Sequence, residues 1–211
     1  MRIQNLTCGS KDYSCNVYLV QGDWDTVSDV NTLIDVGADV SIIPRIKARL
    51  SGIGKKRIDQ VLLTHGDSDH VQILPDIRAV FNPVVYGSSK LMQVDKALED
   101  GELIKIGDKI FKVVHPDIHG IDSLCFLCQE QGVIFIGDAP IDRCHEKGCY
   151  SDKFFKVLEM LTHHNIKEIY PGHGLSILSG ANKVIMDSFI RAEKAKNSST
   201  SFRNWSIGIM E

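Results

Sequence analysis

The sequence predicts an α+β fold in which two mixed β-sheets pack face to face between outer helices. Strand-like apolar runs with helices after them occur twice along the chain, and several of these runs end abruptly in His or Asp. A length of 211 residues allows one sizeable domain with an ample core, and no segment has the composition of a linker. A single domain is therefore expected over residues 1–196, with residues 197–211 as a Ser-rich C-terminal tail.

The first third of the chain is predicted to form short strands joined by tight turns, at residues 1–7, 15–22 and 31–36. A helix is expected near residues 40–50, followed by a buried strand at 58–64 and a second helix over residues 69–81. Pro75 lies inside this second helix. It should either kink the helix or mark its true first turn, because proline cannot donate the interior hydrogen bond.

The rest of the chain is predicted to begin with short strands and helices that alternate through residues 83–98. A meander of strands then fills residues 103–137. An amphipathic helix should begin at Ser151 and continue to Asn165, since its apolar residues recur at helical spacing. A last helix is expected over residues 181–196.

The charge balance argues against several kinds of partner. Lys and Arg number 24 against 27 Asp and Glu, so the net charge is −3 and nonspecific nucleic-acid binding is not expected. No early apolar run has the length of a signal peptide or of a membrane span. We therefore expect a cytoplasmic protein with a small-molecule substrate and no membrane partner, and six cysteines are compatible with a reducing compartment.

Cys125 and Cys128 have the spacing of a metal-binding or redox pair, but they lie in a strand-like run at residues 124–129. Residues three apart on a strand point to opposite faces, so their sulfur atoms should not converge. We interpret both as core residues. Cys144 and Cys149 lie in a polar stretch, which gives little support for a second function.

Residues 64–70, Thr-His-Gly-Asp-Ser-Asp-His, are the most informative stretch of the chain. Two imidazoles and two carboxylates follow directly after the apolar run that ends at Leu63. A capping aspartate in a polar turn would explain one of these side chains. Four of them at the mouth of a buried strand are costly unless a cation neutralises the carboxylates. The stretch therefore predicts a metal site.

Three other apolar runs end in residues that could complete such a site. One ends in His115 and His119, the next in Gly137-Asp138, and the last in a histidine between glycines, His173. Strand ends are where α/β sheets present their reactive side chains. The sequence therefore predicts that these residues gather near residues 64–70.

The order of these four blocks resembles the metallo-β-lactamase superfamily. The resemblance extends from residues 16–20 and 33–37 to Gly174, and so covers nearly the whole chain. It implies a four-layer αββα sandwich of two mixed β-sheets flanked by helices. It also implies a binuclear metal centre in which one ion takes His65, Asp67 and His119.

By the same resemblance, the second ion takes Asp69, His70 and His173, and Asp138 bridges both ions. Asp35 resembles the family's strand-end aspartate, which orients a metal ligand through a hydrogen bond. His115 precedes the expected ligand by four residues, and we interpret it as a supporting residue and not as a ligand.

Asp67 departs from the family pattern, because most members have histidine at this position. Aspartate supplies a hard, charged oxygen in place of a neutral imidazole. Two divalent ions are expected, with zinc first, while iron or manganese becomes possible because of Asp67. The same residue resembles the carboxylate that the flavodiiron branch of the superfamily has at this place, although aspartate is shorter than glutamate.

The resemblance implies a hydrolase. Two ions that share Asp138 should also share a water, which ionises near neutral pH and attacks an ester, thioester, lactone or phosphodiester. Asp69 is the expected catalytic residue, because it would help to aim this hydroxide. The sequence does not specify the substrate-binding residues, and a homodimer is possible because many members of the superfamily are dimers.

The alternative function is that of a non-haem di-iron protein that binds or reduces dioxygen or nitric oxide. Asp67 motivates it. Flavodiiron enzymes carry a flavodoxin-like domain as their electron donor, and 211 − 173 leaves only 38 residues after His173. A protein of this kind would need an external electron donor.

Overall fold

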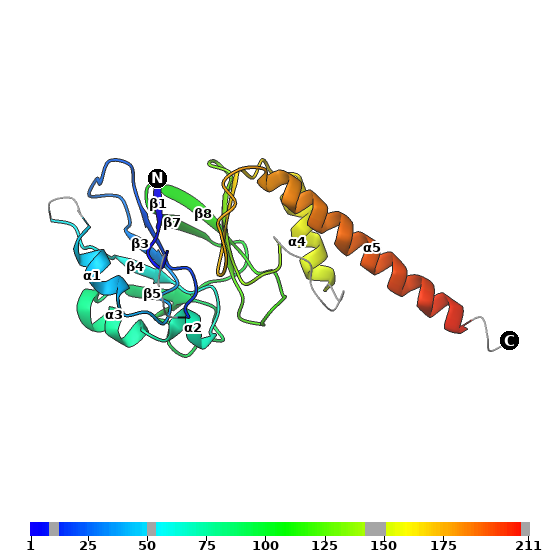
Figure 1. Ribbon diagram of the computed structural model, residues 1–211, viewed down its shortest axis with the longest axis horizontal. Coiled ribbons are helices and arrows are strands. Elements are labelled where there is room, and N and C mark those ends of the chain that lie inside the picture. Colours follow the sequence, from blue (N-terminus) through cyan, green and yellow to red (C-terminus); the bar gives the residue numbers. More distant parts are fainter. Residues whose placement is uncertain (9–12, 50–53, 142–150, 208–211) are drawn as a thin grey trace.

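The computed structural model describes residues 1–8, 13–49, 54–141 and 151–207, with side chains up to residue 196. Its strands form two mixed sheets that lie face to face (Figure 1). The first sheet has the order β1-β2-β3-β4-β5-β6, with strands at Arg2–Asn5, Tyr18–Gln21, Thr32–Ile34, Gln60–Leu62, Val84–Gly87 and Lys96–Ala97. The second has the order β11-β10-β9-β8-β7, with strands, from β7 to β11, at Leu103–Ile106, Lys109–Val114, Cys125–Cys128, Val133–Gly137 and Glu168–Pro171.

Helices cover the outer face of each sheet (Figure 1). Three short helices lie on the first sheet: α1 (Ile42–Lys47), α2 (Ser68–Val71) and α3 (Leu74–Phe81). Two longer helices lie on the second sheet: α4 (Asp152–Thr162) and α5 (Ala181–Ile207). The predicted four-layer αββα sandwich is therefore confirmed.

Three apolar clusters hold the layers together, and alternation along the strands decides which cluster each residue joins. In β4, Val61 packs under α1 and α3, while Leu62 faces the second sheet. In β10, Ile134 packs under α4 and α5, while Phe135 faces the first sheet. The layer between the sheets is rich in aromatic side chains, among them Tyr18, Phe111, Phe126, Phe135 and Tyr170.

The same alternation explains the two cysteines of β9. Cys125 joins the cluster under α4 and α5, and Cys128 joins the cluster between the sheets. Both are buried. The prediction that their sulfur atoms point to opposite faces and belong to the core is confirmed. Cys144 and Cys149 lie outside the described residues.

Three predicted elements differ from the structure. The helix expected over residues 69–81 is two helices, α2 and α3. Pro75 stands in the first turn of α3, which confirms the second of the two alternatives given for it. Residues 83–98 contain β5 and β6 but no helix. The last helix does not end at Lys196, since the backbone of α5 stays helical to Ile207.

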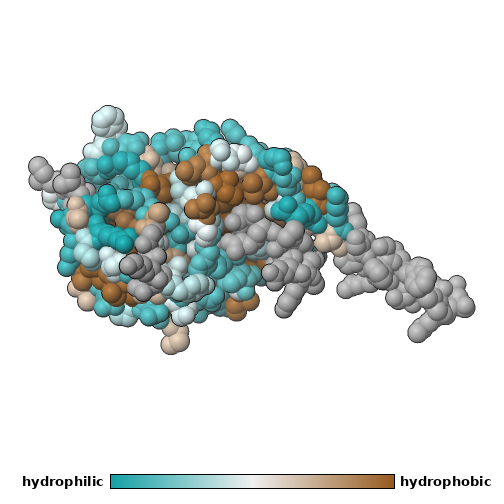
Figure 2. All heavy atoms as spheres, viewed as in Figure 1, coloured by the Kyte–Doolittle hydropathy of each residue, from teal (hydrophilic) through white to brown (hydrophobic). Residues whose placement is uncertain are grey.

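The described surface is largely polar. Figure 2 shows hydrophilic residues over most of one face, with apolar residues gathered over its middle. None of the described helices combines the length and the apolar character that a membrane span requires.

Two glycines with left-handed backbone allow a test of how tightly the layers are joined. Gly132, in the turn between β9 and β10, has φ +69°, and an added Cβ would lie 2.3 Å from the carbonyl oxygen of Asn165. Gly54 has φ +76° and no heavy atom within 4 Å of such a Cβ. We expect Gly54→Ala to lower the free energy of unfolding by roughly 1–2 kcal/mol. Gly132→Ala should cost about 3 kcal/mol or more, because a steric clash adds to the same strain.

Urea denaturation of both variants measures the difference. Equal losses of stability would show that the contact between this turn and Asn165 relaxes freely.

Candidate metal centre

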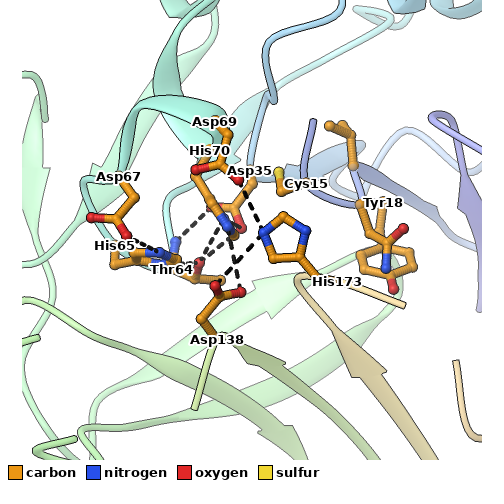
Figure 3. Close-up of polar contacts among 12 residues, drawn as sticks. Cys15, Tyr18, Asp35, Thr64, His65, Asp67, Asp69, His70, Asp138 and His173 are labelled. Carbon is orange, nitrogen blue, oxygen red and sulfur yellow. Dashed lines mark hydrogen bonds and ion pairs between the residues drawn. The ribbon is translucent and has the colours of Figure 1, made fainter. Parts of the chain in front are cut away.

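The candidate site lies where strands of both sheets end. β4 leads directly into His65, and the segment from Asp67 to His70 begins α2. From the second sheet, Asp138 follows β10 and His173 follows β11 (Figure 3). Ends of strands far apart in the sequence thus bring these side chains together.

The start of α2 leaves its carboxylates available. Asp67 is the N-cap residue, with extended backbone (φ −63°, ψ 144°), but its side chain makes no capping hydrogen bond. It is 59% exposed and is directed to His65 and His119, with Nε2–Oδ2 distances of 3.5 and 3.2 Å. Asp69 lies in the first turn of the helix, where the helix dipole favours a negative charge.

All seven predicted ligand positions lie together, in overlapping groups. Potential ligand atoms lie within 4.8 Å of one another in each of two groups of three: His65, Asp67 and His119 form one group, and Asp69, His70 and His173 form the other. The carboxylates contact their histidines closely, as in the 3.0 Å separation of His173 Nε2 and Asp69 Oδ2.

Asp138 stands between these groups. Its Oδ1 lies 3.5 Å from His70 Nε2, and its Oδ2 lies 3.6 Å from His173 Nε2. It also forms a group within 4.8 Å with His65 and His70. One carboxylate therefore reaches side chains of both groups.

Asp35 lies in direct contact with His70, one of the ligands that the family resemblance implies. Its Oδ2 lies 2.8 Å from His70 Nδ1, and both residues are buried. Asp35 also accepts hydrogen bonds from the backbone N–H and the hydroxyl of Thr64, each at 2.8 Å. With Nδ1 held in this way, Nε2 of His70 faces the carboxylate of Asp138 (Figure 3).

Three buried polar atoms at the centre of the site lack hydrogen-bond partners among the described residues: His65 Nε2, His70 Nε2 and Asp138 Oδ1. Buried polar atoms are nearly always paired, and leaving three unpaired in one place is costly. Imidazole nitrogens and a carboxylate oxygen that face one space are a donor set for a divalent transition metal. The residues present therefore fit a metal ion.

The pKa shifts of Asp138 and His70 agree with a metal site. Burial alone would raise the pKa of Asp138, but the neighbouring imidazoles of His70, His173 and His65 lower it to about 2. Burial disfavours the charged form of His70, but the charge of Asp35 and contacts with Asp138 outweigh it and raise the pKa of His70. These contacts favour the protonated form of His70, and a metal ion that binds Nε2 would compete with a proton there.

The loop that carries His119 is held by several contacts. His119 has φ +70°, a left-handed conformation that non-glycine residues rarely adopt. His115 does not join the ligand groups; its Nε2 lies 2.9 Å from the carbonyl oxygen of Ile121 in the same loop. Asp122 Oδ2 accepts a hydrogen bond of 2.8 Å from the backbone N–H of Gly66. The two loops that carry His65 and His119 are thus tied together.

Sequence reasoning missed other contacts of the site. Cys15 lies within 4.8 Å of Asp35 and His70. Burial is the main reason that the pKa of its thiol is raised to about 12, so the thiol is neutral. Tyr13 stacks on His173, with 5.7 Å between ring centroids and 19° between ring planes. Neither Cys15 nor Tyr13 belongs to a recognisable sequence motif. Only the fold brings these two residues to the site.

Two further histidines stand apart from the site. His163 and His164 lie at the end of α4, and their Nδ1 atoms each lie 2.8 Å from a backbone carbonyl oxygen one turn earlier. They bind carbonyl oxygens at the end of a helix. His145 and Tyr150 lie outside the described residues.

The sequence matches curated relatives that are named atrochrysone carboxyl ACP thioesterases. It is 27% identical to the one from Cryptosporiopsis sp. over 126 residues, which are 59% of this chain and 39% of the relative. It is 26% identical to the one from Aspergillus novofumigatus over 173 residues, 80% of this chain and 52% of the relative. The chain thus spans about half the length of these relatives or less.

Solved structures share the fold at low sequence identity. ETHE1 from Myxococcus xanthus has a TM-score of 0.65 and 19% identity, with 93% of this chain and 91% of that chain covered. The flavodiiron protein from Giardia intestinalis has a TM-score of 0.67 and 19% identity, with 85% of this chain and 52% of that chain covered. The model of the metallo-beta-lactamase superfamily matches residues 11–173, well over half of the sequence. The chain belongs to the metallo-beta-lactamase superfamily.

Proposed function

We propose that this protein is a metal-dependent hydrolase with a binuclear centre that cleaves thioesters. The observation that carries the proposal is a set of buried atoms that lack hydrogen-bond partners among the described residues. These atoms, His65 Nε2, His70 Nε2 and Asp138 Oδ1, lie between two groups of carboxylate and imidazole side chains. The domain that carries the activity would span residues 1–196, because α5 packs on α4 up to Ala192. Residues 197–211 would extend beyond it.

One metal position would be formed by His65, Asp67 and His119, and the other by Asp69, His70 and His173. Asp138 would contribute to both, since its two oxygens already face different histidines. Divalent ions held there supply Lewis acidity and lower the pKa of water, which is the chemistry that hydrolysis needs. Zinc is the proposed metal, and the oxygen-rich donor set also suits iron or manganese.

The protein's own residues would prepare the site. Asp35 would accept the Nδ1 proton of His70, which directs Nε2 toward the metal. Asp69 lies in contact with His173 at the edge of the site, where its second carboxylate oxygen could accept a proton from the nucleophile and aim it. We assign Asp69 this catalytic role.

The names of the curated relatives narrow the proposed class of substrate. Of the esters, thioesters, lactones and phosphodiesters that such a site can hydrolyse, the thioester is the bond that proteins named ACP thioesterases cleave. We propose a thioester carried on a small molecule or on a carrier protein. A cytoplasmic location, a homodimer and the lack of a nucleic-acid partner stay predictions.

Removal of metal should abolish hydrolysis. We expect a chelator to lower the rate of hydrolysis of a small acyl thioester by at least about a hundredfold, because bound ions are required to form the nucleophile at neutral pH. Zinc, manganese and iron are then added back one at a time, and the release of free thiol is measured. A protein replete with metal that cleaves neither thioesters nor oxygen esters would contradict the proposed function.

Asp35→Asn should weaken metal binding without unfolding the protein. Asn tolerates the φ of +57° at this position, but its neutral amide replaces the charged acceptor that faces His70. We expect a 10- to 100-fold loss of metal affinity, the usual effect of removing such a support. Competition with a chromophoric chelator measures the affinity.

Asp59→Asn is the matched control, because Asp59 accepts a backbone hydrogen bond from Asn31 at the opposite end of the same sheet. Its metal affinity should equal that of the unchanged protein. If both variants lost metal equally, the effect of Asp35→Asn would be one of general stability.

Asp67 favours a second candidate function, that of a di-iron protein that binds or reduces dioxygen or nitric oxide. With Asp67 in place, each group of three offers two imidazoles and one carboxylate, and oxygen ligands suit iron. Metal analysis of protein isolated without added metal separates the candidates: two irons with a visible charge-transfer band would favour redox chemistry, and colourless zinc would favour hydrolysis.

Asp67→His should shift this preference. Replacing the hard oxygen by an imidazole is expected to lower the ratio of bound iron to bound zinc when the protein is loaded from an equimolar mixture. Asp67→Glu, which keeps the carboxylate, should retain a ratio close to that of the unchanged protein. An iron-to-zinc ratio that is the same in all three proteins would show that position 67 does not select the metal.

A further inference from the structure

Positive charge is concentrated in one segment of this acidic chain. Residues 45–57 contain six cationic residues and neither Asp nor Glu: Arg45, Lys47, Arg49, Lys55, Lys56 and Arg57. The chain has 24 Lys and Arg against 27 Asp and Glu, so the other residues have 24 − 6 = 18 cations against the same 27 acids. Segment 45–57 therefore differs sharply in charge from the remainder of the chain.

Four of the six cations form an exposed group, which we call the basic patch: Lys47, Arg49, Lys56 and Arg57. None of these four takes part in an ion pair with a described residue. The other two cations are engaged elsewhere, because Arg45 binds the carbonyl oxygen of Leu6 and Lys55 binds that of Asp29. The charge of the basic patch is therefore available to a partner.

The patch surrounds a hollow with an apolar wall. Lys47, Lys56 and Arg57 line an open hollow of about 460 Å³, and Val80 and Phe81 at the end of α3 form its other side. Val80 is exposed and Phe81 is half-buried. The hollow thus offers cationic side chains beside apolar surface.

Backbone carbonyl groups hold two of the cations in place without neutralising them. The guanidinium of Arg57 donates to the carbonyl oxygen of Arg49, and Lys56 Nζ lies 3.4 Å from that of Asn82. These contacts are to carbonyl oxygens and not to the backbone N–H donors that a built phosphate site would present. The apolar wall of Val80 and Phe81 beside the cations suits an acidic segment that also carries an apolar side chain.

We propose that the basic patch is a docking surface for an acidic segment of a partner protein. Carboxylates of the partner would pair with Lys47, Lys56 and Arg57, and one apolar side chain would pack against Val80 and Phe81. Charged pairs at such a surface supply steering and specificity, and the apolar contact adds affinity.

This docking surface lies far from the metal centre. The patch precedes β4 and His65 follows it, so the two occupy opposite ends of one strand. The chain advances eight residues from Arg57 to His65, which would span at most roughly 25 Å if it were fully extended. The patch also lies on the side of the molecule away from α4 and α5 (Figure 1). Docking would tether the domain to its partner and leave the metal centre open.

The test uses the full chain and a fluorescein-labelled peptide of repeated Glu-Glu-Leu units, with binding followed by fluorescence anisotropy. Lys56→Glu combined with Arg57→Glu should weaken binding at least about tenfold, because attraction at two positions becomes repulsion. The matched control combines Lys90→Glu with Lys167→Glu, which are exposed lysines outside the patch. This control makes the same change in net charge and should leave binding nearly unchanged. Equal losses in the two double variants would overturn the proposal.

Further arms test the apolar wall and the kind of anion. A Glu-Glu-Ser peptide should bind more weakly than the Glu-Glu-Leu peptide, and this difference should shrink in Val80→Ser, as a double-mutant comparison requires. A single-stranded oligonucleotide that displaced the peptide at equal charge concentration would identify a general polyanion surface and overturn the proposal. Equal affinities for the Glu-Glu-Leu and Glu-Glu-Ser peptides would also overturn the proposal.

A measurement of stability distinguishes a docking role of the basic patch from a purely structural role. Repulsion among four like charges disfavours the fold, so Lys56→Gln should leave the urea midpoint unchanged or raise it, while it weakens peptide binding several-fold. Loss of stability in parallel with loss of binding would overturn the docking role. Thioester hydrolysis by the charge-reversal variants should equal that of the unchanged protein.

Discussion

The candidate site depends on the contact between Asp138 and His70, and this contact depends on how the two sheets pack. His70 belongs to the first sheet's side of the molecule and Asp138 to the second, and their Nε2 and Oδ1 atoms lie 3.5 Å apart. One main-chain bond near the site ties the sheets together, because Asn16 N donates to the carbonyl oxygen of Gly172 at 2.6 Å. Within the second sheet, Gly172 N donates to the carbonyl oxygen of Gly137 at 2.7 Å. A Cβ on Gly172 would lie 2.3 Å from Asp138 Oδ1, so only glycine lets the chain pass this close to the carboxylate.

The aromatic layer between the sheets supports this contact at longer range. Tyr18 and Phe135 are buried, and their ring centroids lie 5.5 Å apart across the two sheets. The hydroxyl of Tyr18 donates to the carbonyl oxygen of Pro171 at 2.8 Å, two residues before His173. The ring of Tyr18 thus packs in the core, while its hydroxyl group holds the loop that carries His173. Because interiors are close-packed, a shift of one sheet would move His173 and Asp138 together relative to His70.

The fold could be predicted from the sequence because it depends on local patterns, whereas the assignment of side chains to two metal positions came from the family resemblance and stays a prediction. Apolar runs define the strands, and His or Asp at their ends marks the edge where chemistry gathers. The choice of His119 over His115 came from family resemblance, and the structure places His119 beside His65 while His115 binds its own loop. The contribution of Cys15 could not be predicted, since only tertiary packing brings it to Asp35.

A rigid strand separates the two properties that we assign to this domain. β4 is buried at each of its three residues and pairs with a parallel neighbour on either side, β3 and β5. Such a strand cannot shift without breaking both ladders and two apolar clusters, so charge placed before it and ligands placed after it keep a fixed separation. Acidic side chains that hold cations and basic side chains that attract acidic partners would weaken one another if they were neighbours. Distance along β4 lets one acidic chain carry both.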